Sequence, residues 1–245
     1  MSFEKKSNPT LAGLFIGIGV LAAGYFMANS FRDVKLANQK ITVKGYAEKD
    51  VTSDRAKWFG NINARGDTQQ DAYAQIQVAK SRMTDFLEKK GLDPKDFSYS
   101  AIQVYPTYTI DDKGRSTGEI NFYNTNVTVS YESDDVELVS KIAKESEELI
   151  KEGVSFSTGQ PMYLFSKLDD LKIELLGKAS KDAKERAEEI TSRVGSDIGA
   201  VRSAQQGVFQ ITSKNDTSTS GYGMYDTSSI EKTVKAVVTI SFATK

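Results

Sequence analysis

Histidine and cysteine are both absent from this chain of 245 residues. Without an imidazole or a thiolate there is no Ser-His-Asp or Cys-His machinery, no nucleophilic cysteine and no ordinary zinc site. The chain also lacks the side chain that most often titrates near neutral pH. These absences disfavour most hydrolase and redox mechanisms, and we predict no catalytic residue and no cofactor. The lack of cysteine is compatible with an oxidising compartment and equally with a reducing one.

Carboxylates leave two alternatives open. A carboxylate hydrolase needs two acids that face each other across a pocket, and Asp169 or Asp170 supplies one of them while the sequence identifies no partner. Asp111 and Asp112 invite a calcium interpretation, but the expected series of further oxygen donors is missing and basic residues follow. We therefore expect neither an enzyme nor a metal site.

The charge of the chain is balanced, with 32 basic and 33 acidic residues. No basic stripe is visible after Lys44, although a nucleic-acid-binding protein needs one to neutralise phosphates. We therefore predict no nucleic-acid partner.

Leu11–Ala28 is an apolar run without a charged residue. A helix of this length reaches roughly 27 Å, which is close to the thickness of a bilayer core. We predict an uncleaved membrane anchor within residues 1–31 and a linker over residues 32–40. The residues expected to contact lipid are Leu11, Phe15, Ile16, Ile18, Val20, Leu21 and Phe26. A cleaved signal peptide is one alternative, because basic residues precede the run and small residues end it. A buried helix of a soluble domain is the other.

Flanking charge does not orient the anchor, because basic residues lie on both sides of it. A short N-terminal tail favours export of the C-terminal body, and large domains translocate largely regardless of flanking charge. Gly13 and Gly17 form a small-xxx-small pair, through which two such helices can approach closely.

Hydrophobic periodicity predicts a mixed α+β domain. Alternation with period two indicates strands at residues 41–47, 54–65, 97–110, 120–132, about 153–166, about 198–212 and 231–243. Spacings of three and four indicate a helix after a Thr68 cap, one from Ser133 or Asp134 to about Lys151, and a long one over residues 167–193. The order strand, helix, two-stranded hairpin occurs twice, at about residues 54–132 and 154–243. We therefore predict a transmembrane helix followed by a duplicated β-α-β-β domain over residues 41–245, with mostly antiparallel sheet packed with helices.

The long helix carries oppositely charged residues four positions apart. These pairs are Lys181 with Glu185, Asp182 with Arg186, and Lys184 with Glu188. A solvated face is the simpler interpretation of such a helix. Its small residues Ala179, Ala183 and Ala187 leave room for another element to pack closely.

The segment from Lys214 to Ser229 is rich in Thr, Ser, Asn, Asp and Gly, which is typical of a mobile loop. Tyr222, Met224 and Tyr225 give this loop an exposed tip. A disordered loop is the simpler interpretation, and contact of these three residues with a partner or a membrane is the alternative.

Several motifs resemble the SIMPL-domain family. They are residues 41–45 (Ile-Thr-Val-Lys-Gly), 105–108, 124–129, 153–156, 179–183 with Arg186 and Ala187, and 195–199. Residues 204–211 are similar to a membrane-anchored bacterial branch of that family. In order and spacing these motifs cover nearly everything after Lys40.

The resemblance implies a bacterial cell-envelope protein, either periplasmic or anchored in the inner membrane. Together with the apolar run, it leads us to predict a single-pass protein of the inner membrane with its C-terminal domain in the periplasm or outside the cell. Some members form ring-like or channel-like oligomers, some are linked to oxidative-stress tolerance, and animal relatives act as adaptors in kinase signalling. No catalytic residues are implied. Because two long hairpins also have edge strands that need pairing or protection, we predict a non-enzymatic, envelope-anchored scaffold. Its expected partners are the lipid bilayer and further copies of itself.

The rival prediction is a binding module for a small ligand or an envelope polymer, with Tyr105, Tyr108, Tyr123 and Tyr222 as contact residues. Tyrosines on half-buried strands are more often packing residues, so this alternative needs an exposed cluster around a cleft. The two predictions differ in what the exposed side chains contact, a second copy of the chain or a ligand.

Overall fold

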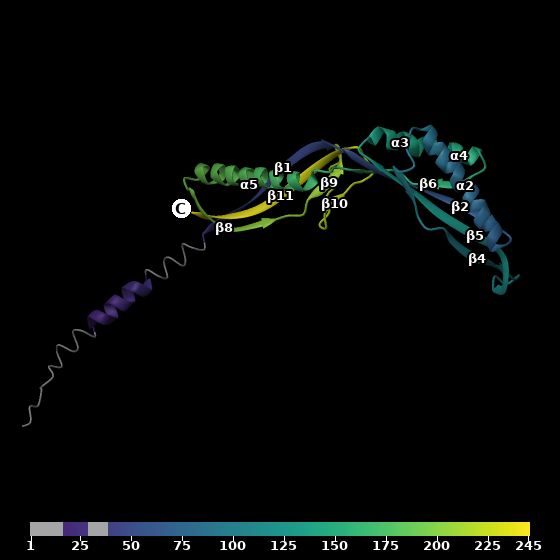
Figure 1. Cartoon of the computed structure of the whole chain (residues 1–245). Coiled ribbons are helices and arrows are strands. Elements are labelled where there is room, and N and C mark those ends of the chain that lie inside the picture. The colour runs from purple at the N-terminus through teal and green to yellow at the C-terminus, as the bar shows by residue number, and fades with distance from the viewer. Residues whose placement is uncertain (1–16, 29–38) are drawn as a thin grey trace, which may run out of the picture. The chain divides into compact units, whose positions relative to one another are not determined.

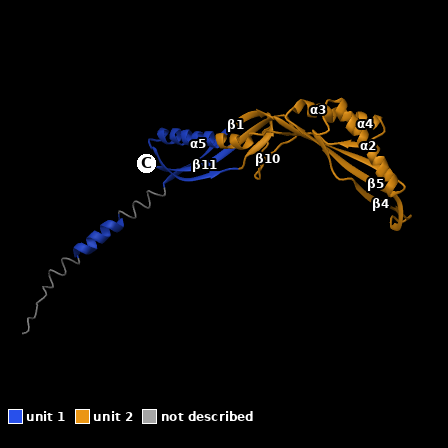
Figure 2. Ribbon diagram, viewed as in Figure 1, with its two compact units in different colours: residues 1–47, 176–207, 236–245 blue, residues 48–175, 208–235 orange. Residues whose placement is uncertain are grey.

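The structure, a computed structural model, describes residues 17–28 and 39–245. Figure 1 labels its helices and strands. The chain divides into two compact units (Figure 2). Unit 1 comprises residues 1–47, 176–207 and 236–245, and unit 2 comprises residues 48–175 and 208–235.

Residues 17–28 form a helix near the N-terminus (Figure 1). Within the described ranges, no helix combines the length and the apolar character needed to cross a membrane. Residues 11–16 of the predicted anchor lie outside the described residues.

A six-stranded antiparallel sheet forms most of unit 2. Its strands are β2 (Arg55–Gly66), β3 (Phe97–Tyr99), β4 (Gln103–Ile110), β5 (Ser116–Ser133), β6 (Ser155–Thr158) and β7 (Met162–Leu164). β2 and β5 lie at the centre, β3 and β4 pair with β5, and β6 and β7 pair with β2. β2 follows the predicted alternation, because Ala56, Trp58 and Ile62 are buried on one side of the strand.

Three helices cover this buried side of the unit 2 sheet (Figure 1). They are α2 (Gln69–Lys89), α3 (Val136–Glu145) and α4 (Glu148–Lys151). Thr68 caps α2 as predicted, since its hydroxyl oxygen accepts the backbone N–H of Asp71 at 3.1 Å. The predicted stripe of α2 is buried against the sheet and consists of Ala72, Ile76, Ala79, Met83, Phe86 and Leu87.

The second predicted helix is corrected at both its cap and its length. Asp135, and neither Ser133 nor Asp134, is the cap, because its carboxylate accepts the Leu138 N–H at 2.9 Å. The helix also stops at Ser146, a fully buried residue whose hydroxyl donates to the carbonyl of Ala143 at 2.6 Å. Such a side-chain bond competes with the helical ladder. The segment therefore forms α3 and the short α4 rather than one helix.

The core of unit 2 is built around Trp58, which is fully buried. Its ring lies 6.2 Å from that of Phe156, and its indole Nε1–H donates to the Thr158 hydroxyl at 2.7 Å. Burial of this indole is favourable because its polar atom has a partner.

Unit 1 contains parts of three long elements and one complete strand. They are β1 (Lys40–Thr52), α5 (Leu168–Arg193), β8 (Ile198–Gln206) and β11 (Glu231–Thr244). β11 is hydrogen-bonded to β1 and pairs antiparallel with β8. The predicted apolar face of β11 is buried, and its unit 1 members are Ala236, Val238, Ile240 and Phe242.

β1 packs closely on the small residues of α5, as the alanine stripe predicts. A Cβ placed on Gly45 would lie 2.0 Å from the backbone oxygen of Ala179 and 2.6 Å from the backbone nitrogen of Ala183. Beside this contact, the Tyr46 N–H donates to the carboxylate of Asp182 at 2.8 Å. Glycine is therefore required at position 45 by the approach of two backbones.

All three predicted charge pairs of α5 form. The nitrogen–oxygen distances are 3.4 Å for Lys181 and Glu185, 2.7 Å for Arg186 and Asp182, and 3.5 Å for Lys184 and Glu188. Apart from the half-buried Asp182, the members of these pairs are exposed, and a pair on such a helix surface contributes only about 0.3 kcal/mol. The spacing of three and four also predicts that Ile190 and Val194 are buried, but Ile190 near the end of α5 and Val194 just after it are exposed.

The C-terminal part of unit 2 adds β9 (Gln210–Ser213) and β10 (Met224–Tyr225). β9 pairs antiparallel with residues 232–235 of β11, and β10 runs parallel to β9. Three predicted long strands are interrupted, so that β3 and β4, β6 and β7, and β8 and β9 are separate. The alternation of side chains continues across these breaks, and for that reason the sequence predicted single strands.

Candidate functional site

The first candidate surface is the hairpin made by β4 and β5, and we call residues 103–124 the arm. The two strands pair from Gln103 with Asn126 to Ile110 with Ser116, with two register shifts near the tip. Residues 112–121 are all exposed, so no described helix covers this end of the hairpin.

Three large apolar side chains share one face of the arm. Tyr108 lies opposite Ile120 in the register. A register shift follows Tyr108, but the burial of β4 still alternates there, since Tyr108 and Ile110 are exposed and Thr109 between them is half-buried, which places Ile110 on the side of Tyr108. Their exposed fractions are 45% for Tyr108, 66% for Ile110 and 48% for Ile120. Grouped apolar side chains on a surface indicate an interaction site.

The turn of the arm contains the two aspartates considered for calcium. Oδ1 of Asp111 accepts the backbone N–H groups of Lys113 and Arg115, both at 2.9 Å, and Oδ2 binds the Arg115 guanidinium. The backbone N–H and the guanidinium of Arg115 lower the pKa of the Asp111 carboxyl. This carboxylate therefore stabilises its own turn. Within the described ranges, no group of three or more acids is arranged to hold a metal ion.

The second candidate surface is the loop of residues 214–229, which we call the contact loop. Side chains outside it hold its backbone at three points. Lys232 Nζ donates to the carbonyl of Asp226 and Lys235 Nζ to that of Asp216, both at 2.6 Å. The Gln210 side chain donates to the carbonyl of Ser220 at 2.7 Å and accepts its N–H at 3.2 Å. The loop thus has an ordered base.

The three predicted tip residues lie in different surroundings on this base. Tyr222 is fully exposed, Tyr225 is half-exposed in β10, and Met224 is half-buried in the same strand. Of these three residues, Tyr222 is therefore the most exposed.

The tyrosines of the rival prediction do not form one cluster on the arm. Tyr105 lies opposite Asn124 and Tyr123 lies opposite Pro106, so Tyr105 and Tyr123 point to opposite faces. Tyr105 is 48% exposed, whereas Tyr123 is half-buried.

Four of the predicted lipid-contacting residues are described. Ile18, Val20, Leu21 and Phe26 are 55–76% exposed in the helix of residues 17–28. The remaining three, Leu11, Phe15 and Ile16, lie outside the described residues, as does Gly13 of the small-residue pair. At Gly17 an added Cβ would meet no atom within 4 Å, so this position is open to a close neighbour.

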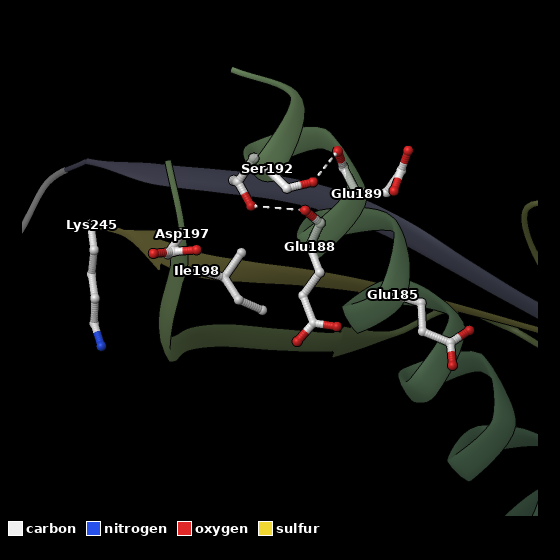
Figure 3. A pocket seen from close by; sticks show the side chains of 8 residues that line it. Glu185, Glu188, Glu189, Ser192, Asp197, Ile198 and Lys245 are labelled. Carbon is white, nitrogen blue, oxygen red and sulfur yellow. Dashed lines mark hydrogen bonds between the residues drawn. The ribbon is translucent and has the colours of Figure 1, made fainter. Parts of the chain in front are cut away.

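A hollow of about 680 Å³ in unit 1 lies between the end of α5, the start of β8 and Lys245 (Figure 3). Glu185, Glu188 and Glu189 line it from the helix. Each of these acids already pairs with a basic residue of α5, and Glu189 binds Arg193 at 2.8 Å. Asp169, considered for a hydrolase, is likewise exposed and pairs with Lys172 at 3.0 Å. Paired, solvated carboxylates do not have the arrangement of an acid–base pair across a cleft.

Sequence reasoning missed a third surface, on the side of the unit 2 sheet opposite the helices. We call it the polar face, and it consists of Ser157, Asn61, Thr128, Ser155, Asn63 and Asn126. The alternation of β2 and β5 placed four of these residues on the solvent side, but only the strand register brings all six together.

These features define a mixed α+β protein with mostly antiparallel sheets, which confirms the predicted fold class at that level. The chain belongs to the SIMPL family, because the family model, described as a protein of unknown function (DUF541), matches residues 41–242. This match confirms the predicted family and assigns no enzymatic activity. No curated protein matches the chain.

Two solved structures are similar to parts of the chain. An amidase of the hydantoinase/carbamoylase family from Burkholderia phymatum is 12% identical over 54% of this chain and 33% of the amidase, with a TM-score of 0.27. An uncharacterized conserved protein from Listeria innocua is 12% identical over 78% of this chain and 91% of that protein, with a TM-score of 0.18. The chain thus spans about a third of the length of the amidase.

Proposed function

We propose that this protein is a non-enzymatic scaffold that self-associates through the arm. The observation that supports this proposal is the joint exposure of Tyr108, Ile110 and Ile120 on one face of the arm. Full burial of a large apolar side chain contributes about 1.5 to 3 kcal/mol, so contact between these side chains of two copies favours association.

The arm favours face-to-face packing over extension of the sheet. β4 is an edge strand of the described sheet, but Pro106 in its middle cannot donate a backbone hydrogen bond. A second copy of the chain is also a better occupant than a bilayer, because the turn carries charged residues of both signs. The arms of two copies are therefore expected to pack through their apolar faces.

Ile110→Asp and Ile120→Asp should each abolish assembly of the full-length protein. A buried carboxylate opposite an apolar face is unfavourable, and we expect the dissociation constant to rise by about 100-fold. Light scattering of the protein in detergent measures this change. The matched control is Ile150→Asp, because Ile150 is 55% exposed and lies on α4 outside the arm. A wild-type protein that is monomeric at high concentration, or arm variants that assemble normally, would contradict the proposal.

The second part of the proposal concerns location. The apolar N-terminal run tethers the scaffold to the inner membrane, with the C-terminal body in the periplasm or outside the cell, and Gly13 with Gly17 pairs two tethers. The exposed apolar side chains of residues 17–28 support this proposal, because their surfaces are available for contact with lipid. The duplicated β-α-β-β unit and a link to stress tolerance stay predictions from the sequence and the resemblance.

Protease added to intact spheroplasts should digest the C-terminal body and leave a membrane-bound N-terminal fragment. An antibody against the C-terminus and a cytoplasmic marker protein measure the digestion. The cytoplasmic marker must stay intact in the same sample. Full protection of the body, with cleavage only after lysis, would reverse the proposed orientation.

A further inference from the structure

We propose that the polar face binds a neutral, N-acetylated glycan chain. The strand register arranges its six residues in two rows across β6, β2 and β5. Ser157, Asn61 and Thr128 form one row, and Ser155, Asn63 and Asn126 form the next. This function is independent of self-association through the arm.

Hydrogen bonds within each row orient its amide groups. The Thr128 hydroxyl donates to Oδ1 of Asn61 at 2.8 Å, and Nδ2 of Asn126 donates to Oδ1 of Asn63 at 3.0 Å. Both of these Oδ1 atoms are thereby engaged, which leaves the Nδ2 groups of Asn61 and Asn63 as donors and Oδ1 of Asn126 as an acceptor. The rows therefore present fixed donors and acceptors side by side.

The polar face is open to a ligand. The helices of unit 2 pack on the other side of the sheet, against Trp58, Ile62 and Val127 (Figure 1). Asn61, Ser155 and Ser157 are exposed, and the other three members of the face are half-buried between their neighbours. A ligand can therefore lie across the strands without displacing a described element.

Charge complementarity selects a neutral ligand. No member of the polar face is charged, and the nearby charges are already engaged. Lys57 binds Glu132 at 3.6 Å, and the Arg65 guanidinium lies 4.5 Å from the centre of the Phe122 ring. A phosphate backbone or an acidic peptide would thus find no cluster of unpaired cations here. Hydroxyl and acetamido groups match the exposed amides and hydroxyls.

The width of the sheet and a tyrosine beside the polar face favour an extended chain of sugars. Four neighbouring strands from β6 to β4 span roughly 14 Å at the usual strand spacing. Tyr105 of β4 lies opposite Asn124, on the side of the sheet that carries the polar face, and is 48% exposed. Its ring offers an apolar surface on which the C–H face of a sugar can stack. The free Nδ2 donors of Asn61 and Asn63 and the Oδ1 acceptor of Asn126 match the carbonyl and the N–H of an acetamido group, so the expected ligand is an N-acetylated chain.

The test uses the β-1,4-linked hexamer of N-acetylglucosamine and the full-length protein in a detergent without sugar groups. Isothermal titration should show binding by the wild type. Asn61→Ala and Asn63→Ala should each weaken it about tenfold, the usual consequence of one lost neutral hydrogen bond. Asn121→Ala is the matched control, because Asn121 is an exposed asparagine of β5 outside the polar face. If either asparagine variant fails to fold, Ser157→Ala on β6 replaces it.

Several results would overturn the proposal. They are no binding by the wild type, an equal loss in Asn121→Ala, and tighter binding of an acidic polymer such as polygalacturonate. A change of molecular mass in the polar-face variants, with unaltered affinity for the hexamer, would assign the face to contact between copies instead. Because the arm variants Ile110→Asp and Ile120→Asp should keep full affinity for the hexamer, failure of self-association and failure of glycan binding are distinguishable.

Discussion

Gly45→Ala should lower the free energy of unfolding of unit 1 by about 3 kcal/mol, because the added methyl group has no space. Its Cβ would lie 2.0 Å from the backbone oxygen of Ala179 and 2.6 Å from the backbone nitrogen of Ala183. Both atoms belong to the backbone of α5, so no rotation of a side chain relieves the clash. β1 must move away from the helix and weaken the bond between the Tyr46 N–H and Asp182.

Denaturant unfolding of the full-length protein with two probes measures this loss. Far-UV circular dichroism reports both units, whereas the single tryptophan, Trp58, is buried in the core of unit 2. For Gly45→Ala we expect part of the dichroism to be lost at a lower denaturant concentration than in the wild type. The midpoint of the Trp58 fluorescence should change less, because it reports unit 2. The control is Gly177→Ala in α5, where a Cβ meets no atom within 4 Å and the loss of a helical glycine should add about 0.5 to 1 kcal/mol. An unchanged midpoint for Gly45→Ala would show that β1 and α5 are not tightly packed.

The contact at Gly45 also shows how far the sequence predicts the fold. The spacing of Ala179, Ala183 and Ala187 predicted a close neighbour, because residues four positions apart lie on the same face of one helix. The identity of that neighbour was not predictable, since β1 lies more than a hundred residues earlier in the chain. The break between α3 and α4 was not predicted, because the apolar pattern of a segment does not show where a side chain interrupts its backbone hydrogen bonds. Ser146 ends α3 through a hydrogen bond to its own helix, and the apolar pattern continues past it.

The candidate sites were predictable only where a single segment builds them. The aromatic tip of the contact loop was visible in the sequence, but its ordered base was not, because Gln210, Lys232 and Lys235 lie outside the segment. Lys232 in particular is almost fully buried, although lysine usually lies on the surface of a protein. The polar face combines residues of three strands, so it depends on a register that the sequence does not specify.

Asp226→Ala should destabilise unit 2 by about 3 kcal/mol and release the contact loop, because it leaves a buried cation without its carboxylate partner. The Lys232 side chain is only 2% exposed, and its Nζ lies 3.5 Å from Oδ2 of Asp226. The same carboxylate accepts hydrogen bonds from Ser228 and Ser229. We expect an earlier unfolding transition in the Trp58 fluorescence and faster proteolysis within residues 214–229.

The control for this prediction is Lys232→Met, which replaces the buried cation by an apolar side chain of similar length. Replacement of a buried ion-pair member by a hydrophobic residue is far less costly than leaving a charge unpaired, and Asp226 keeps its serine partners. Lys232→Met should therefore cost about 1 kcal/mol or less. Equal destabilisation by Lys232→Met and Asp226→Ala would show that the loss of the pair, rather than the unpaired ammonium, determines the effect.

The pH dependence of the same pair gives an independent check. Burial acts to raise the pKa of Asp226, but hydrogen bonds from Ser229 and Ser228 and the charge of Lys232 outweigh it, so this pKa lies well below its ordinary value. A carboxyl whose pKa is lower in the folded state contributes stability above its unfolded pKa of about 3.9, and that stability is lost as the pH falls further towards the folded value. The difference in unfolding free energy between the wild type and Asp226→Asn should thus stay constant from pH 7 to pH 5 and shrink below about pH 4. A difference that does not shrink as the pH falls below about 4 would mean that these contacts do not lower the pKa of the Asp226 carboxyl.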